Sequence, residues 1–232
     1  MKEEITAIVL AAGQGRRMNS TVQKQFLLLQ DKPVLYYSLQ CFQNSDVDRI
    51  VLVTGETEIE YCRSEIVEKY NINKVTDIIA GGRERYDSVE QGLNCIMDGI
   101  VLIHDGARPF VTTDIVQRSI QTAKEKGACT AGVPVKDTIK IVDAEHYGIA
   151  TPDRNTLWQI QTPQTFRVSL LKEAYACMRQ SEYGNITDDT MLVERYCGVR
   201  VKVIEGDYQN LKLTTPEDMI LAEQILRTSD RI

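Results

Sequence analysis

The stretch Ile5-Thr6-Ala7-Ile8-Val9-Leu10-Ala11-Ala12-Gly13-Gln14-Gly15-Arg16-Arg17-Met18 decides the fold. Its first six residues are apolar or β-branched, which is typical of a strand that is buried on both faces of a parallel sheet. Glycines and arginines follow this strand directly. Gly13 and Gly15 let backbone N–H groups approach an anion closely, and the arginines add positive charge. The stretch therefore predicts a phosphate-binding loop at the end of a buried strand.

Apolar runs alternate with amphipathic stretches over the first half of the chain. The expected strands and helices after the first strand are, in chain order, a helix at 33–42, a strand at 49–54, a helix at 58–70, a strand at 75–79, a helix at 84–97 and a strand at 100–104. This alternation predicts an α/β fold, with a Rossmann-like, mostly parallel sheet and helices on both faces. Right-handed crossovers then bring the loops that leave the strands to one edge, where ligands bind in such sheets.

The alternation loosens after Ala128. A further core strand is expected at 130–135. Two alternating runs, at 137–143 and 157–162, flank a polar turn, and we interpret them as a β-hairpin arm at about 137–160. An exposed hairpin is marginally stable alone, so we expect the arm to pair with a second subunit. The remaining elements, which complete a single domain over 1–232, are expected helices at 169–178, 188–196 and 216–227 and expected strands at 201–204 and 211–213.

Composition excludes several classes of protein. Lys and Arg total 27 against 33 Asp and Glu, a formal charge of −6, which is unfavourable for binding nucleic acid or an anionic membrane. The N-terminus lacks the pattern of a signal peptide, and no run of about 18 apolar residues occurs, so we expect a cytoplasmic protein without a membrane span. The six cysteines form no Cys-x-x-Cys pair, which favours free thiols over a zinc site.

The first loop differs from two common phosphate-binding motifs. It lacks the Gly-x-x-x-x-Gly-Lys-Ser/Thr pattern of a Walker loop, and Met18 stands where a dinucleotide-binding fold has its third glycine. A dinucleotide oxidoreductase is also disfavoured because Thr54-Gly55 occupy the place of the acidic residue at the end of the second strand. The glycines alone fit an ordinary tight turn equally well. Arg17 and Lys24 shift the interpretation towards nucleotide binding.

Several blocks carry a family resemblance. The run 10–18 followed by Lys24-Gln25-Phe26 resembles the sugar-phosphate nucleotidyltransferases. Six further blocks recur in order, at 81–89, 104–110, 133–140, 161–166, 187–189 and 211–218. Together they resemble the 2-C-methyl-D-erythritol 4-phosphate cytidylyltransferase family over nearly the whole chain. Ribitol-5-phosphate cytidylyltransferases share many of these blocks, but 135–138 and Asp153-Arg154-Asn155-x-Leu157-Trp158 are more similar to the erythritol enzymes.

The resemblance implies an enzyme, a nucleotidyltransferase of isoprene biosynthesis. In this family a phosphate oxygen of methylerythritol phosphate attacks the α-phosphorus of CTP, pyrophosphate leaves, and 4-diphosphocytidyl-2-C-methyl-D-erythritol forms in the non-mevalonate pathway. The attacking phosphate is already largely anionic near neutral pH, because its second pKa is about 6. No strong general base is needed, which agrees with a chain that has only two histidines. The alternatives are a ribitol-5-phosphate cytidylyltransferase and a non-catalytic nucleotide-binding protein of the same fold.

The resemblance also implies roles for particular residues. The catalytic residues it implies are Arg17, Lys24, Arg154 and Lys212. The substrate-binding residues it implies are Ala11, Ala12, Gly13, Gly15, Gly82, Asp87, Ser88, Asp105, Ala107, Arg108 and Thr138. Mg²⁺ is expected to bind with CTP, with Asp105 on the metal side, and a homodimer is expected to exchange arms so that Thr138 and Arg154 serve the partner's site. Gln23 stands where the family commonly has proline, which is expected to loosen the backbone before Lys24.

Overall fold

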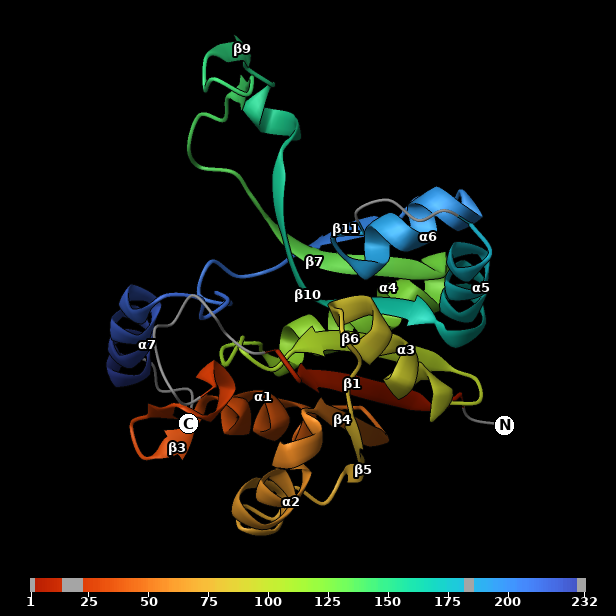
Figure 1. Ribbon diagram of the computed structural model, residues 1–232, viewed down its shortest axis with the longest axis vertical. Helices are drawn as coiled ribbons and strands as arrows, with labels where there is room; N and C mark the ends of the chain where they lie inside the picture. The colour runs from red at the N-terminus through yellow and green to blue at the C-terminus, as the bar shows by residue number, and fades with distance from the viewer. Residues whose placement is uncertain (1–2, 14–22, 182–185, 229–232) are drawn as a thin grey trace.

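A seven-stranded sheet forms the centre of the computed structural model, which describes residues 3–13, 23–181 and 186–228 (Figure 1). The strand order is β11-β7-β10-β6-β1-β4-β5. The strands are β1 (Ile5–Ala11), β4 (Arg49–Thr54), β5 (Val75–Ala80), β6 (Ile100–Asp105), β7 (Ala128–Pro134), β10 (Trp158–Arg167) and β11 (Lys202–Glu205). β1 and β6 lie in the middle of the sheet and are almost wholly buried, as their apolar sequences predict.

The expected mostly parallel sheet is confirmed, with one exception. β1 runs parallel to β4 and β6, β4 to β5, and β7 to β11. β10 runs antiparallel to both of its neighbours, β6 and β7. The chain returns from β7 to β10 through the arm and without a crossover helix, so the two strands run in opposite directions.

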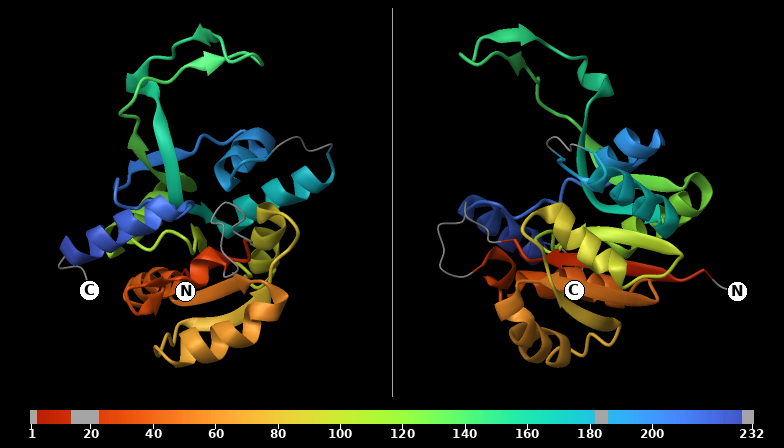
Figure 2. Two further views of the ribbon diagram at one scale, coloured as in Figure 1. Left: turned by 60° about the vertical axis from the view of Figure 1, so that its left-hand side comes forward. Right: turned by 45° about the vertical axis from the view of Figure 1, so that its right-hand side comes forward.

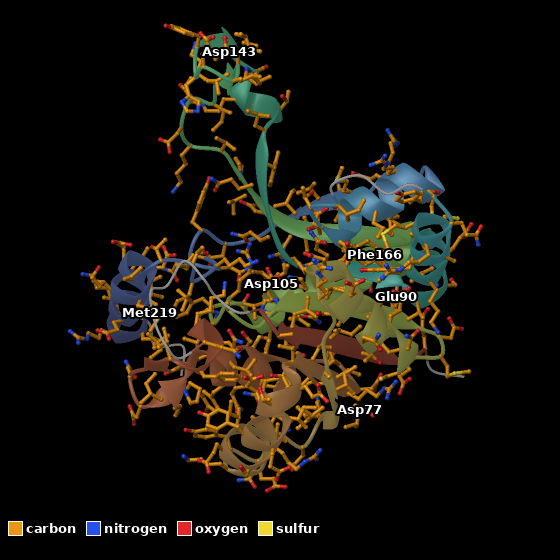
Figure 3. The ribbon with its side chains drawn as sticks, viewed as in Figure 1. Asp77, Glu90, Asp105, Asp143, Phe166 and Met219 are labelled. Carbon is orange, nitrogen blue, oxygen red and sulfur yellow. The ribbon has the colours of Figure 1, made fainter. Side chains whose placement is uncertain are left out.

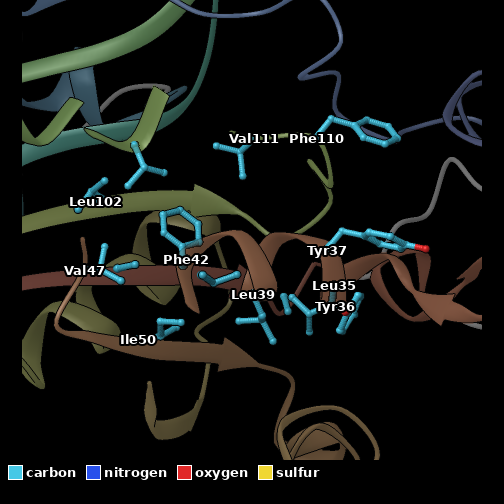
Figure 4. Packing of buried hydrophobic residues seen from close by; sticks show 14 of the residues in the cluster. Leu35, Tyr36, Tyr37, Leu39, Phe42, Val47, Ile50, Leu102, Phe110 and Val111 are labelled. Atoms are coloured by element: carbon cyan, nitrogen blue, oxygen red, sulfur yellow. The ribbon is translucent and has the colours of Figure 1, made fainter. Parts of the chain in front are cut away.

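Helices cover both faces of the sheet, as predicted. On one face α1 (Val34–Gln43), α4 (Thr113–Lys126) and α7 (Pro216–Thr228) contribute to one apolar cluster, and on the other α3 (Arg85–Asn94), α5 (Val168–Arg179) and α6 (Asp189–Cys197) contribute to a second. Figure 4 shows Leu35, Leu39 and Phe42 of α1 against Ile50 and Leu102 of the sheet, all fully buried. Burial of these side chains fixes α1 against this face of the sheet.

Three helical segments differ from expectation. No helix was predicted at α4, although Thr112 Oγ1 accepts a hydrogen bond from Ile115 N at 3.3 Å and Gly127 ends the helix with φ 86°. The single helix expected at 58–70 is a 3-10 turn, η3 (Glu56–Glu58), a short α2 (Ile59–Tyr61) and a π-helical stretch, η4 (Cys62–Glu68). The helix expected at 84–97 ends at Asn94.

The arm projects from the sheet, as Figures 1 and 2 show, but its strand pairing corrects the prediction. The hairpin at the tip consists of β8 (Ile141–Val142) and β9 (Gly148–Ala150), followed by the 3-10 turn η5 (Arg154–Thr156). The run at 157–162, expected as the second hairpin strand, is instead the start of β10 and pairs with β7. Alternation of polar and apolar residues identifies a strand but does not specify its partner.

The strand expected at 211–213 is absent from the described residues, where this segment is irregular. Leu213 N donates one isolated backbone hydrogen bond, to Ala107 O at 2.9 Å, in place of a ladder. The next backbone donors, Thr214 N and Thr215 N, are accepted by Asp218 Oδ2 at 2.7 and 2.8 Å, which starts α7. The segment is therefore a strap between the sheet and α7, held by isolated hydrogen bonds.

All six cysteines, which lie in described segments, are free. In residues 3–13, 23–181 and 186–228, no helix combines the length and hydrophobicity needed to cross a membrane.

The remaining short elements are η2 (Lys24–Phe26) and the ribbon of β2 (Leu28–Leu29) with β3 (Lys32–Pro33).

Candidate active site

The site lies where the order of the sheet changes direction. From β1 the chain moves outward to β4 and β5, then returns to place β6 on the other side of β1. Leu10 of β1 is paired with Asp105 of β6, so the two strands end side by side. Loops that leave such neighbouring strands diverge and open a crevice, which is where ligands bind in open α/β sheets.

A pocket of about 690 Å³ occupies this position. It is lined by Leu10, Ala11, Ala12, Gly13, Lys24, Gln25, Gly82, Arg83, Glu84, Arg85, Ser88, Asp105, Ala107 and Lys212. Its size is in the range of pockets that hold a nucleotide-sized ligand. The lining comes from five separate parts of the chain, which only the folded sheet brings together.

One wall of the pocket is backbone that cannot carry larger side chains. A Cβ atom on Gly81 would lie 2.6 Å from Cβ of Ala12 and 2.7 Å from Oγ of Ser88. Ser88 Oγ accepts a hydrogen bond from Gly82 N at 3.1 Å and donates to Glu84 O at 3.2 Å. The close approach of these segments therefore needs glycine at position 81.

Lys24 reaches the pocket from η2, whose position is set by Gln25. The Gln25 side chain is buried, and its Nε2 donates to Ala11 O and to Gly13 O, at 3.3 Å for the latter. The turn is thereby tied to the end of β1. Gln23 keeps φ at −62°, the value that proline imposes, and its side chain donates to Glu58 Oε1 at 2.7 Å. The looser backbone expected from the loss of proline stays a prediction.

Asp105 at the pocket floor is surrounded by cations. Its Oδ2 lies 2.8 Å from Lys212 Nζ and 3.9 Å from Arg108 Nε, and its Oδ1 lies 3.3 Å from Arg85 Nε. Burial alone would raise the pKa of Asp105, but the positive charges of Arg85, Lys212 and Arg108 hold it well below its ordinary value. The carboxylate is therefore ionised at neutral pH, and it orients Lys212 at the floor of the pocket.

A buried histidine fixes the backbone around Asp105. His104 Nε2 lies 3.2 Å from Arg108 O and Nδ1 lies 3.0 Å from Thr162 Oγ1, while Asp105 N donates to the same Thr162 oxygen at 3.1 Å. A neutral ring that donates from Nε2 and accepts at Nδ1 satisfies all three contacts. Burial lowers the pKa of His104 to about 4.

His104 should make stability depend on pH. The unfolded chain protonates this ring near pH 6.5, whereas the folded protein does so only near pH 4. The unfolded state therefore binds more protons in this window, and the free energy of unfolding should fall by up to about 3 kcal/mol as pH decreases from 6.5 to 4. Urea unfolding at several pH values between 4 and 6.5 measures the slope of the free energy of unfolding against pH. His104→Gln should flatten it, and equal slopes in the two proteins would contradict the assignment.

The family model for 2-C-methyl-D-erythritol 4-phosphate cytidylyltransferase matches residues 5–228. An enzyme of that name from Lachnoclostridium phytofermentans is 52% identical over 228 residues, covering 97% of both chains, and one from Clostridium botulinum is 49% identical over 224 residues, covering 95% of this chain and 96% of the relative. The chain belongs to the 2-C-methyl-D-erythritol 4-phosphate cytidylyltransferase family. It is a nucleotidyltransferase of the non-mevalonate route to isoprenoids.

Solved structures of the family share the fold. The 4-diphosphocytidyl-2C-methyl-D-erythritol synthase of Anaerococcus prevotii superposes with a TM-score of 0.85 at 33% identity, covering 97% of this chain and 96% of that one. The 2-C-methyl-D-erythritol 4-phosphate cytidylyltransferase of Thermus thermophilus gives a TM-score of 0.79 at 30% identity, with 97% and 100% coverage. The α/β architecture predicted from the sequence is thus that of the family.

The structure gathers most of the predicted site residues into the pocket. Those that line it are Ala11, Ala12, Gly13, Lys24, Gly82, Ser88, Asp105, Ala107 and Lys212. Gly15 and Arg17 lie outside the described residues. Asp87 and Arg108 lie behind the lining: Asp87 accepts from Glu84 N at 3.0 Å and pairs with Arg179, and Arg108 Nη1 donates to Asn210 O at 2.8 Å.

Thr138 and Arg154 are not near this chain's pocket. Both are exposed on the arm, and Arg154 Nη1 donates to Lys136 O at 3.0 Å. Figure 3 shows Asp143 at the arm tip, well separated from Asp105 at the pocket. The half of the site assigned to the arm is therefore not assembled within a single chain.

Arg85 lines the pocket and was assigned no role from the sequence. A signal for it existed, because Arg85 precedes Ser88 by three residues. Residues at this spacing share one face of a helix, and Ser88 was expected to face the ligand. Gln25 was missed as a lining residue for another reason: its role depends on its contacts with the end of β1.

Proposed function

We propose that this single domain, residues 1–232, transfers the cytidylyl group of CTP to 2-C-methyl-D-erythritol 4-phosphate in the pocket described above. The observation that carries the proposal is that Lys24 and the Lys212–Asp105 pair, which come from distant parts of the chain, line one pocket. Two anions must meet in this reaction, and two separate cations in one pocket allow each anion to be neutralised and aligned.

The two halves of the pocket suit the two ends of CTP. Gly82 and Ser88, joined by a hydrogen bond from Gly82 N to Ser88 Oγ, present small groups that suit the edge of a pyrimidine. Ala107 also lines the pocket. The loop that begins at Gly13, with Arg17 and Lys24, suits the triphosphate. Lys24 would neutralise the charge that builds on the phosphates as pyrophosphate leaves, and Lys212 would hold the phosphate of the acceptor.

We also propose that a divalent cation binds with CTP. In the described residues, no group of three or more His, Cys, Asp or Glu side chains forms a metal site. Mg²⁺ is usually held by one or two carboxylates together with substrate phosphates. Asp105 would be such a carboxylate only if it exchanged its contact with Lys212 or Arg85 for the ion. When bound, the ion would neutralise negative charge on the phosphate oxygens.

The arm is proposed to complete the site of a second subunit. It exposes a set of large apolar side chains, which is costly for a hairpin in water. These are Ile139, Ile141, Val142, Tyr147, Ile149, Trp158 and Ile160, each between 38% and 68% exposed. Exchange of arms in a homodimer would bury them and bring Thr138 and Arg154 to the partner's pocket.

The six free thiols are typical of the cytoplasm, which is the compartment that we propose.

The acceptor is decided by measuring pyrophosphate release from CTP. The purified chain with Mg²⁺ should turn over 2-C-methyl-D-erythritol 4-phosphate with a higher kcat/KM than ribitol 5-phosphate. The longer polyol must extend further from Lys212, so poorer alignment should reduce its rate by at least about tenfold. Faster turnover of ribitol 5-phosphate would contradict the choice of acceptor, and no release with either would favour a binding protein.

A further inference from the structure

Arg85 connects the pocket floor to a second, fully buried carboxylate. Its Nε lies 3.3 Å from Asp105 Oδ1, and its Nη1 donates to Asp189 Oδ2 at 2.7 Å. Asp189 is 1% exposed, at the start of α6. A guanidinium carries several donors in one rigid plane, so this single side chain ties two carboxylates from distant parts of the chain.

Asp189 is itself held by two further residues. Tyr175 of α5 donates its hydroxyl to Asp189 Oδ1 at 2.9 Å, and Gln164 Oε1 of β10 accepts from Asp189 N at 3.0 Å. Tyr175 and Gln164 are both 2% exposed, and neither lines the pocket. The chain of contacts runs from Tyr175 through Asp189 and Arg85 to Asp105.

We propose that Arg85 is a positioning residue, which holds the Asp105 carboxylate on the side opposite Lys212 and is itself kept in place by Asp189 and Tyr175. This inference rests on the proposed function for its effect on turnover. Asp105 contacts Arg85 through one oxygen and Lys212 through the other, so the two cations fix the carboxylate plane from two directions. Without Arg85, Asp105 can follow Lys212, and the ammonium loses its fixed direction.

The charges around this chain of contacts explain why Asp189 is buried. Arg85, Arg108 and Lys212 are three cations that converge on Asp105. One carboxylate would leave the group strongly positive and would draw Arg85 to the Lys212 side. Asp189 supplies a second negative charge from the α6 side and keeps Arg85 apart from Lys212. A net positive charge still remains to attract an anionic ligand.

The central test replaces both charges together, because a single change leaves an unpaired buried charge and risks unfolding. Arg85→Gln with Asp189→Asn keeps polar groups at both positions. We expect kcat to fall between about tenfold and a hundredfold, with a small change in the KM for CTP. The groups that face Asp105 in this variant are Lys212, Arg108 and His104. Loss of Arg85 should also change the surroundings of the Asp105 carboxyl, which the ¹³C chemical shift of that carbon reports at neutral pH.

Tyr175→Phe tests the far end of the contact chain, with Tyr37→Phe as its matched control. Tyr37 is also buried, and it donates its hydroxyl to Leu29 O at 2.7 Å, away from the pocket lining. Each change removes one buried hydroxyl hydrogen bond, so similar losses of stability are expected. Only Tyr175→Phe should lower kcat, by less than the double change. An equal loss in Tyr37→Phe would overturn the inference, because it would trace the effect to stability.

The ¹³C chemical shift of the Asp105 carboxyl carbon separates this inference from the proposed function. If the unmodified protein releases no pyrophosphate, the proposed function fails, and that chemical shift in the double variant still decides whether Arg85 positions Asp105. An unchanged chemical shift overturns the inference whatever the turnover. A changed chemical shift with reduced kcat supports both.

Discussion

Lys24→Ala is expected to remove nearly all pyrophosphate release from CTP while the protein stays folded. Lys24 lies at the surface of the pocket on a short 3-10 turn, and the turn is anchored by Gln25, whose contacts with the end of β1 do not involve the ammonium. Lys24 places a positive charge where negative charge develops in the transition state. Removal of one such preorganised group lowers the rate by about 100- to 1000-fold. Steady-state kinetics with circular dichroism measures both properties.

Lys69→Ala is the matched control. Lys69 is exposed and pairs only weakly with Glu65, at 3.3 Å one helical turn away. Its loss removes the same charge from the protein without touching the pocket. If Lys24→Ala and Lys69→Ala keep similar kcat values, the pocket does not act through Lys24, and the non-catalytic alternative gains support.

Arg154→Ala should lower turnover by about a hundredfold, because Arg154 is expected to align the acceptor phosphate. The residue lies on the arm and outside this chain's own pocket, so its effect should pass between subunits. Mixing Lys24→Ala with Arg154→Ala chains provides a direct test. In a mixed dimer with exchanged arms, one pocket contains both changes, and the other contains neither.

Activity should therefore return when two inactive proteins are mixed. With random exchange of subunits about half of the dimers are mixed, and each has one intact pocket, so about a quarter of the unmodified activity is expected. Differently tagged subunits allow the mixed dimer to be purified and assayed alone. Formation of mixed dimers without recovery of activity would contradict arm exchange between sites.

Much of the site could be predicted from short-range signals. The apolar run at 5–10 and the glycines after it indicate a buried strand and a phosphate loop, because strand burial and close backbone approach depend on local side chains. Lys24, Gly82, Ser88 and Lys212 were placed by the family resemblance, and the pocket contains all four.

Other features depended on long-range packing. The alternation at 157–162 marked a strand, but the partner of that strand is set by the return of the chain between β6 and β7. The strap at 211–213 has strand-like residues, yet its neighbours offer only isolated acceptors such as Ala107 O. Arg85 was missed because its two carboxylate partners come from β6 and α6.

The sequence by itself determined the alternating α/β pattern and the family and predicted a phosphate loop, since each depends on residues close together in the chain or on blocks in a fixed order. The tertiary structure alone decided that Asp105 is surrounded by Arg85, Arg108 and Lys212. The physical reason is that electrostatic contacts depend on distances between side chains from separate elements, and only strand order and helix packing fix those distances.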